Sequence, residues 1–234
     1  MTITSATTEP GIVSVTVDYP PVNAIPSAGW FELADTITAA GRDPNTHAVI
    51  LRAEGRGFNA GVDIKEMQNT EGFGALIDAN RGCYEAFRAV YECQVPVIAA
   101  VNGPAIGGGW GYAMSCDIRI ASPTAIFSAT FSKMGLGPDA GVSRSLPRVI
   151  GHARTLELLL TAEQLDADEA LRLGIVSKVV DDAVGESIAL AEQLAAVPAH
   201  TSRTIKATLL RAAESDLKTT LWDIEPTAQA QLIC

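Results

Sequence analysis

The sequence predicts an α/β fold, and two observations carry that prediction. Short apolar runs of the kind that form buried strands alternate with helical segments along residues 1–185. The runs "HAVILRAEG" (47–55) and "VPVIAAVNG" (95–103) are typical examples, and a helical stretch at 73–91 separates them. The last fifty residues predict helices without strands, so we expect a helical segment appended to an α/β core.

Each element follows from its local pattern. Residues 11–25 begin with period-two alternation and stop at a double proline, which indicates a strand leading into a turn. A helix is expected at 27–40, with Ser27 as its N-cap. The remaining expected elements are a short helix at 108–116, strands at 117–122 and 125–130, helices at 141–151, 154–161 and 167–174, and a last strand at 175–180. Beyond about Val184 the chain is expected to be helical, with breaks at Pro198 and Pro226.

Composition narrows the class of protein. The net charge of −10 without any basic run argues against a nucleic-acid surface. The N-terminal residues lack the pattern of a secretory signal, and no apolar run reaches the roughly twenty residues that a membrane span needs. Four cysteines without CxxC spacing and three scattered histidines predict no metal site. We therefore expect a cytoplasmic protein with neither a nucleic-acid nor a membrane partner.

Two glycine-rich segments point to a binding site for a developing negative charge. They are "GRGFNAGVDIKEM" (55–67) and "VNGPAIGGGWGYAMSCD" (101–117), and each follows a predicted strand. Glycine lets a ligand approach the main chain, and the start of a helix near Gly108 offers unpaired N–H groups. A carbonyl oxygen that gains charge would be stabilised there. The patterns of dinucleotide-binding loops, P-loops, HExxH zinc sites and GxSxG nucleophile elbows are all incomplete or absent.

These segments resemble the crotonase superfamily, the enoyl-CoA hydratase/isomerase family. The matching motifs are, in order, "FNAGVDIKEM", "PVIAAVNGPAIGGGWGYAMSCDIRIAS", "FSKMGLGPDAGVSRSLPRVIG" and "LLTAEQLDADEALRLGIVSKVV". The resemblance implies a crotonase (ClpP-like) spiral of ββα units over residues 1–185. It also implies a C-terminal helical segment at 186–234 that builds a homotrimer or a dimer of trimers. The chain ends early for this family, so we expect that segment to be truncated.

The resemblance also implies the ligand and the parts of the site. The ligand would be an acyl-CoA thioester, so coenzyme A enters as part of the substrate and no separate cofactor is expected. The thioester carbonyl would lie between the backbone N–H groups of Val62 and Gly108. Coenzyme A would contact Asp63 and Lys65. The acyl group would contact the side chains of Trp110, Met134 and Leu136.

The two glutamates that typical hydratases of the family carry are missing. Their positions fall on Gly111 and Phe131. A glycine inside a helix costs about 1 kcal/mol relative to alanine, so we expect Gly111 to leave room for a bulky acyl group. One acid remains at a position that isomerases of the family use, Asp139 in "GLGPDAG". The resemblance therefore implies that Asp139 is the catalytic acid and base.

A single carboxylate favours a double-bond isomerase. Asp139 would remove a proton made acidic by the thioester, the N–H groups of Val62 and Gly108 would hold the enolate oxygen, and the acid would return the proton elsewhere. Three alternatives stay open. They are an enoyl-CoA hydratase, a hydrolase that opens a carbon ring in a cyclic, sterol-derived acyl-CoA, and a non-catalytic acyl-CoA binding protein. Residues up to about Gly103 resemble the ring-opening branch most closely, and later residues resemble the isomerases.

Overall fold

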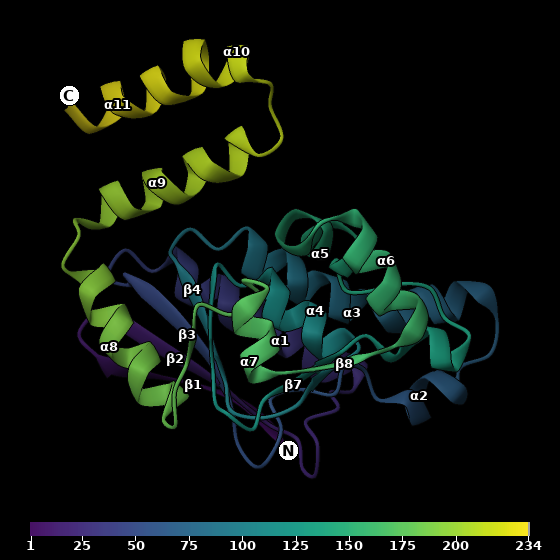
Figure 1. Ribbon diagram of the computed structural model, residues 1–234. Helices are drawn as coiled ribbons and strands as arrows, with labels where there is room; N and C mark the ends of the chain where they lie inside the picture. Colours follow the sequence, from purple (N-terminus) through teal and green to yellow (C-terminus); the bar gives the residue numbers. More distant parts are fainter. Residues whose placement is uncertain (234) are drawn as a thin grey trace.

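The computed structural model, which describes residues 1–233, has two β-sheets surrounded by helices (Figure 1). The larger sheet has the strand order β1-β2-β3-β4-β6-β9 and the smaller sheet has the order β5-β7-β8. The strands are β1 (Thr2–Glu9), β2 (Ile12–Asp18), β3 (Ala48–Ala53), β4 (Val97–Val101), β5 (Ala105–Ile106), β6 (Ile118–Ala121), β7 (Ile126–Ser128), β8 (Gln164–Asp166) and β9 (Lys178–Val179). The α/β class that the sequence predicts is confirmed.

Helices account for most of the remaining chain. In order they are α1 (Ser27–Arg42), α2 (Ile64–Gln68), α3 (Phe73–Tyr91), α4 (Gly108–Ser115), the short turn η1 (Thr130–Met134), α5 (Val142–Ile150), α6 (His152–Thr161), α7 (Ala167–Arg172), α8 (Ala183–Ala195), α9 (Ala199–Ala212), α10 (Leu217–Thr219), η2 (Thr220–Ile224) and α11 (Glu225–Ile233). The predicted helix at 73–91 has the same bounds in the structure, and most other predicted elements are found within a few residues.

The parallel strands β2, β3 and β4 form the centre of the larger sheet. Alternate residues of β3 face opposite layers, because successive side chains of a strand point to opposite faces. Val49 and Leu51 belong to the apolar cluster that includes α1 and α3, whereas Ala48 and Ile50 belong to the cluster that includes α8. Both faces are therefore covered by helices, which explains why the predicted strands at 47–55 and 95–103 are almost continuously apolar.

Two details of the helix ends differ from the sequence expectation. Pro26, rather than Ser27, is the N-cap of α1, and Ser27 is its first helical residue. The Glu66 carboxylate accepts a hydrogen bond from the Ser27 N–H at 2.8 Å, so α2 supplies the cap that Ser27 was expected to give. Pro226 does not break the chain into separate helices. It lies at the second position of α11, directly after the π-helical turn η2.

The C-terminal segment divides differently from the predicted boundary between residues 185 and 186. That boundary falls inside α8, and α8 packs on the larger sheet through Ala183 and Ala191. Helices α9, α10 and α11 stand away from the body in Figure 1. The part that projects therefore begins at α9, after the break that was correctly predicted at Pro198.

Lys206 anchors the projecting helices to the sheet. Its side chain is 8 % exposed, and its Nζ donates to the Asp117 carboxylate at 2.7 Å and to the Val95 carbonyl at 3.0 Å. Asp117 also accepts a hydrogen bond from the N–H of Val97, at the start of β4. One carboxylate therefore ties α9 to the strand that leads toward α4.

Replacing Lys206 with methionine should loosen this anchor. We expect Lys206→Met to lower the free energy of unfolding by about 1–3 kcal/mol, because removing one partner leaves the other charge without compensation. Denaturant unfolding gives the free energy, and amide hydrogen exchange in α9 locates the loss. Lys218→Met, at an exposed lysine of α10, is the control and should change little. Equal stability of the two variants would contradict the proposed anchor.

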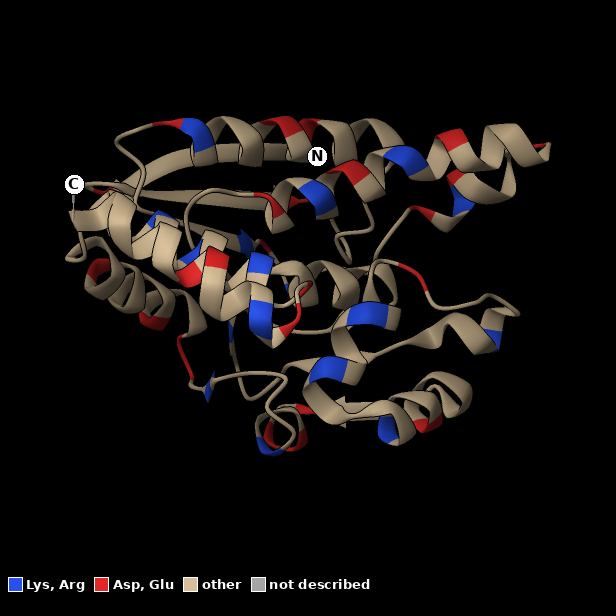
Figure 2. Ribbon diagram, turned by 90° about the horizontal axis from the view of Figure 1, so that it is seen from above, with Lys and Arg blue, Asp and Glu red and all other residues tan. Residues whose placement is uncertain are grey.

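Charged residues are spread over the helices. Figure 2 shows Lys and Arg interspersed with Asp and Glu along the chain rather than gathered into one stripe of a single sign. No helix among residues 1–233 combines the length and the apolar character that a membrane crossing requires.

Candidate active site

Two backbone segments that are far apart in the sequence meet at the candidate site. Asn59 pairs with Ala105 as an isolated parallel bridge, and the Asn59 carbonyl accepts a hydrogen bond from the Ile106 N–H at 2.9 Å. The Asn59 side-chain oxygen accepts a second hydrogen bond, from the Gly61 N–H at 2.8 Å. Asn59 therefore fixes both glycine-rich segments that the sequence singled out, one through its main chain and one through its side chain.

The N–H groups of Val62 and Gly108 lie beside each other where the segments meet. A Cβ atom placed on Gly61 would lie 3.1 Å from the Gly108 nitrogen, and one placed on Gly108 would lie 3.9 Å from the Val62 nitrogen. Gly61 also has a φ of +84°, which side chains other than glycine rarely adopt. Glycine at 61 is thus required both by the backbone conformation and by the close approach.

Neither N–H group is used elsewhere. Within residues 1–233, the N–H groups of Val62 and Gly108 donate no hydrogen bond to another part of the chain. Gly108 is the first residue of α4, so its N–H belongs to the positive end of that helix. Two adjacent, unpartnered donors at a helix start have the chemistry required to stabilise a carbonyl oxygen that gains negative charge.

Asp139 lies on the turn that joins η1 to α5, and the turn touches α4. Its neighbour Ala140 has a φ of +55° and packs against Gly111, one helical turn beyond Gly108. One oxygen of the Asp139 carboxylate, Oδ1, accepts hydrogen bonds from the Ala140 N–H and from the Tyr84 hydroxyl, each at 2.6 Å. The structure therefore brings Asp139 to the same helix that carries the Gly108 N–H.

Tyr84 and Cys83 of α3 are the titratable groups that adjoin Asp139. Partial burial, together with the hydrogen bond to the Asp139 carboxylate, raises the pKa of Tyr84 well above its usual value. Burial, and to a lesser extent the charge of Asp139, raises the pKa of the Cys83 thiol. Both groups are consequently protonated at neutral pH, and Tyr84 acts as a hydrogen-bond donor to the carboxylate.

The positions of the two missing glutamates are both filled. A Cβ atom on Gly111 would lie only 2.2 Å from the Ala140 Cβ and 2.4 Å from the Ala140 carbonyl oxygen. The expectation that Gly111 leaves space for a bulky acyl group is therefore wrong, because the turn that carries Asp139 occupies that space. Phe131 is buried in η1 and belongs to the main apolar cluster.

The predicted acyl-binding residues are not alike in the structure. Trp110 has no exposed surface and instead packs in the core, with its ring centroid 6.2 Å from that of Phe127. Met134 and Leu136 precede Asp139 and are exposed, at 44 % and 58 % of their surface. Met134 and Leu136 therefore have surface that a ligand could contact, whereas Trp110 has none.

The predicted coenzyme A contacts lie at the start of α2, directly after Val62. Asp63 is the N-cap of that helix, and its carboxylate accepts a hydrogen bond from the Lys65 N–H at 2.9 Å. The Lys65 side chain is exposed and forms no ion pair within residues 1–233. Coenzyme A binding by Asp63 and Lys65 stays a prediction.

Sequence reasoning missed the parts played by Asn59 and Tyr84. Asn59 lies inside the motif "FNAGVDIKEM", so an amide next to a glycine-rich turn was a signal that could have been used. No local signal marks Tyr84, because its partner Asp139 is 55 residues away in the sequence. Only the folded chain brings these two side chains together.

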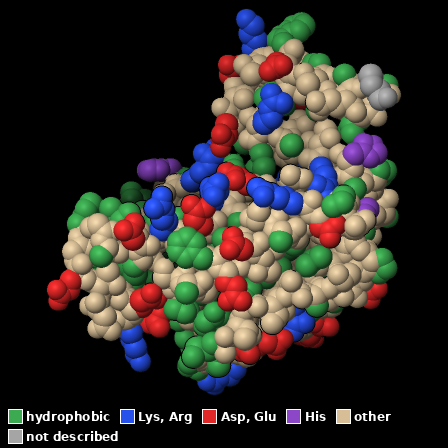
Figure 3. Space-filling model, turned by 180° about the vertical axis from the view of Figure 1, so that it is seen from behind, with side chains coloured by type: hydrophobic (Ala, Val, Ile, Leu, Met, Phe, Trp, Pro, Cys, Tyr) green, Lys and Arg blue, Asp and Glu red, His purple; other side chains and the backbone are tan. Residues whose placement is uncertain are grey.

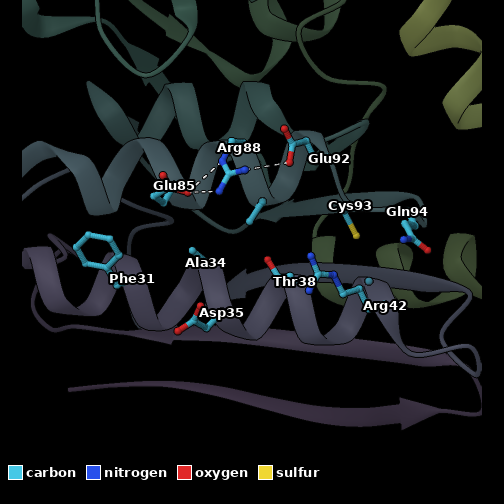
Figure 4. A pocket seen from close by; sticks show the side chains of 12 residues that line it. Phe31, Ala34, Asp35, Thr38, Arg42, Glu85, Arg88, Glu92, Cys93 and Gln94 are labelled. Carbon is cyan, nitrogen blue, oxygen red and sulfur yellow. Dashed lines mark hydrogen bonds and ion pairs between the residues drawn. The ribbon is translucent and has the colours of Figure 1, made fainter.

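Two cavities lie near α3. One, of about 450 Å³, lies between parts of α1 and α3, and its lining includes Arg88, which pairs with Glu85 and Glu92 (Figure 4). The other, of about 430 Å³, adjoins the Ala140–Gly141 turn and has arginines in its lining. Figure 3 shows basic side chains, with acidic ones between them, along the line where the C-terminal helices meet the body. Neither cavity is lined by Val62 or Gly108.

Comparison with known proteins gives consistent results. The sequence profile described as "Enoyl-CoA hydratase/isomerase" matches residues 7–233. The chain is 55 % identical over 212 residues to the "(7aS)-7a-methyl-1,5-dioxo-2,3,5,6,7,7a-hexahydro-1H-indene-carboxyl-CoA hydrolase" of Mycobacterium tuberculosis, covering 89 % of this chain and 84 % of that protein.

Two further relatives carry hydratase names. The chain is 40 % identical over 165 residues to a crotonyl-CoA hydratase of Syntrophomonas wolfei, covering 68 % of this chain and 61 % of that protein. The crystal structure of an enoyl-CoA hydratase from Bacillus anthracis superposes with a TM-score of 0.95 at 30 % identity, covering all of this chain and 91 % of the other.

Proposed function

Because the chain belongs to the enoyl-CoA hydratase/isomerase family, we propose that it hydrolyses a cyclic keto acyl-CoA thioester and opens its carbon ring. One observation carries the choice of reaction. The relative that is 55 % identical over 212 residues, covering 89 % of this chain, is a hydrolase whose named substrate is a dioxo bicyclic carboxyl-CoA thioester. The hydratase relatives share fewer residues, at 40 % and 30 % identity.

The site residues supply the parts that such a reaction requires. The proposed substrate has a ring ketone next to a saturated ring carbon. That carbon is bonded to a C=C bond, which is conjugated with the thioester carbonyl. The thioester oxygen accepts hydrogen bonds from the N–H groups of Val62 and Gly108. The Asp139 carboxylate removes a proton from a water molecule, and the resulting hydroxide adds to the ketone carbon.

Ring opening follows from the collapse of that adduct. The C–C bond between the former ketone carbon and the neighbouring saturated ring carbon breaks. Its electron pair passes through the double bond to the thioester oxygen, where the two N–H groups stabilise the charge. The carboxylic acid of Asp139 then gives its proton to carbon. The product equals the substrate plus one water, with a new carboxylate where the ketone stood.

The filled glutamate positions support a reaction that differs from ordinary hydration. Addition of water across a double bond in the family's hydratases relies on two glutamates, and this chain has Gly111 and Phe131 at those positions. The Asp139 atom Oδ2 forms no hydrogen bond within residues 1–233, because both donors contact Oδ1. One carboxylate with one free oxygen is sufficient for a base that later acts as an acid.

Double-bond isomerisation is the second candidate. The presence of a single carboxylate, that of Asp139, favours it as well. A single carboxylate can remove a proton from one carbon and return it to another without any water molecule. The two N–H groups would hold the enolate oxygen in the same way. The two reactions differ in the source of the proton, which is a water molecule in ring hydrolysis and a carbon of the substrate in isomerisation, and in the cleavage of a C–C bond, which belongs to ring hydrolysis.

Exposed apolar residues on the projecting helices support the expected trimer or dimer of trimers. Leu209, Leu217 and Trp222 are each at least 66 % exposed. Covering them with another copy of the chain would remove that surface from water. Mass photometry at several protein concentrations tests this part of the proposal, and a monomer at every concentration would contradict it.

Isotope labelling separates the two reactions. Cyclic keto acyl-CoA thioesters and open-chain unsaturated ones are incubated with the protein in deuterated water and, separately, in heavy-oxygen water. Ring hydrolysis places one heavy oxygen in a new carboxylate and one deuterium on carbon. Deuterium without heavy oxygen would support the isomerase instead. Release of free coenzyme A thiol would show thioester cleavage and would contradict both.

A further inference from the structure

The Asp139 carboxylate is held by two donors and by no cation. Its Oδ1 atom accepts from the Tyr84 hydroxyl and from the Ala140 N–H at the same distance, 2.6 Å. Within residues 1–233, no Lys, Arg or His lies within 4.0 Å of it as an ion pair. The Ala140 N–H is part of the same turn, so Tyr84 is the one side chain that ties the carboxylate to another element of the fold.

We propose that Tyr84 is a positioning residue, which holds the Asp139 carboxylate in the orientation that leaves Oδ2 free to exchange protons with the reacting molecule. This inference rests on the proposed function, since it concerns the group that the reaction uses as base and acid. Both hydrogen bonds end on Oδ1, so they hold that oxygen against α3 and the Ala140 N–H and leave Oδ2 without a donor among residues 1–233. A base must lie within hydrogen-bond reach of the proton that it removes, so its orientation affects the rate.

The elements on either side are suited to this function. Tyr84 belongs to the long helix α3, and its ring meets Phe87 edge-on, with centroids 6.5 Å apart. Asp139, in contrast, follows an exposed loop that contains Gly135, Gly137 and Pro138. The hydrogen bond from Tyr84 of helix α3 should therefore restrict the motion of the Asp139 side chain, which lies on a loop.

The protonation state of Tyr84 fits a donor. Partial burial and the hydrogen bond to Asp139 raise the pKa of Tyr84, so the hydroxyl keeps its proton throughout the pH range of a neutral enzyme. The buried Cys83 thiol is the other titratable group beside Asp139, and its pKa is also raised. Both titratable neighbours of the Asp139 carboxylate are therefore uncharged at neutral pH.

The first test removes the hydroxyl alone. In Tyr84→Phe we expect kcat to fall by roughly 10- to 100-fold, as for the loss of one hydrogen bond to a charged group. KM should stay within about twofold, because Tyr84 acts through Asp139 and makes no binding contact of its own. The acid limb of kcat should move to higher pH, because the carboxylate loses a donor that favours its charged form.

Tyr91→Phe is the matched control. Tyr91 lies two turns further along α3, and within residues 1–233 its hydroxyl makes only long hydrogen bonds, at 3.3 Å to Glu214 and 3.4 Å from Arg144. We expect its kcat, KM and pH profile to match the parent protein. The Tyr84 side chain is 51 % exposed, so Tyr84→Phe should unfold at the same denaturant concentration as the parent. An equal loss of kcat in both variants would overturn the inference.

A double-mutant cycle separates this inference from the proposed function. If Tyr84 acts through the Asp139 carboxylate, adding Tyr84→Phe to Asp139→Asn should cause no further loss. Full turnover in Asp139→Asn would show that the proposed function is wrong. Loss of turnover in Asp139→Asn together with an unchanged rate and unchanged acid limb in Tyr84→Phe would overturn the positioning of Asp139 by Tyr84 and leave the proposed function intact.

Discussion

Asp139→Asn should lower kcat by about 10²–10⁴-fold, the usual contribution of a general acid–base group. An amide cannot take a proton from water or return one to carbon. The fold should survive, because the amide oxygen can still accept the two hydrogen bonds from Tyr84 and Ala140 that the Oδ1 atom accepts now. Affinity for the thioester should also survive, since the N–H groups of Val62 and Gly108 are untouched.

Steady-state rates and calorimetric binding of the same thioester check both halves of this prediction. Asp78→Asn is a suitable control, because Asp78 is exposed on α3 and its side chain forms no hydrogen bond with the part of the chain that the structure describes. The control should match the parent protein in rate and affinity. A kcat for Asp139→Asn equal to that of the control would remove Asp139 from the mechanism.

Gly111→Glu should disable the protein rather than give it hydratase activity. The new side chain would start from a Cβ atom 2.2 Å from the Ala140 Cβ and 2.4 Å from the Ala140 carbonyl oxygen. The turn must move, and it carries Asp139 with it. We expect a loss of at least the 1–3 kcal/mol that is typical of overpacking a core, and a loss of turnover as the Asp139 turn is displaced.

Gly111→Ala tests whether the steric clash with Ala140, rather than the charge of the glutamate, causes the loss. It introduces the same Cβ atom without a carboxylate, so it should also lose stability by about 1–3 kcal/mol. Denaturant unfolding and turnover are compared for both variants and the parent protein. A Gly111→Glu protein that is as stable as the parent and hydrates an enoyl-CoA would contradict the packing described for Ala140.

Long, strongly patterned elements could be predicted from the sequence. The helix at 73–91 and the strand inside 95–103 are examples, because helical periodicity and a continuous apolar run are local signals. Strand β1 was missed. Its sequence "TITSATTE" is polar and exposed over most of its length, and only antiparallel pairing with β2 holds it at the sheet edge. Such pairing is a property of the tertiary structure, which overrides local preference.

The part of the candidate site that lies in the two glycine-rich segments could be predicted from the sequence. Two glycine-rich motifs marked the segments, the family resemblance implied Val62 and Gly108 as the donors, and the structure puts their N–H groups side by side. The contact between Tyr84 and Asp139 and the packing of Ala140 on Gly111 were not predictable. Each joins segments that are separated by tens of residues, and the second also depends on an Ala140 φ of +55°.

The packing of Ala140 on Gly111 also limits how this protein can change its chemistry during evolution. A single substitution cannot restore a hydratase glutamate at 111, because the turn occupies the space before the carboxylate is in place. Withdrawing the turn first would move Asp139 and should impair the reaction proposed for it. The glutamate at position 111 and the withdrawal of the turn must therefore arise together, because either change alone should lower fitness. The contact between Ala140 and Gly111 therefore makes a glutamate at position 111 incompatible with the present position of the Asp139 turn.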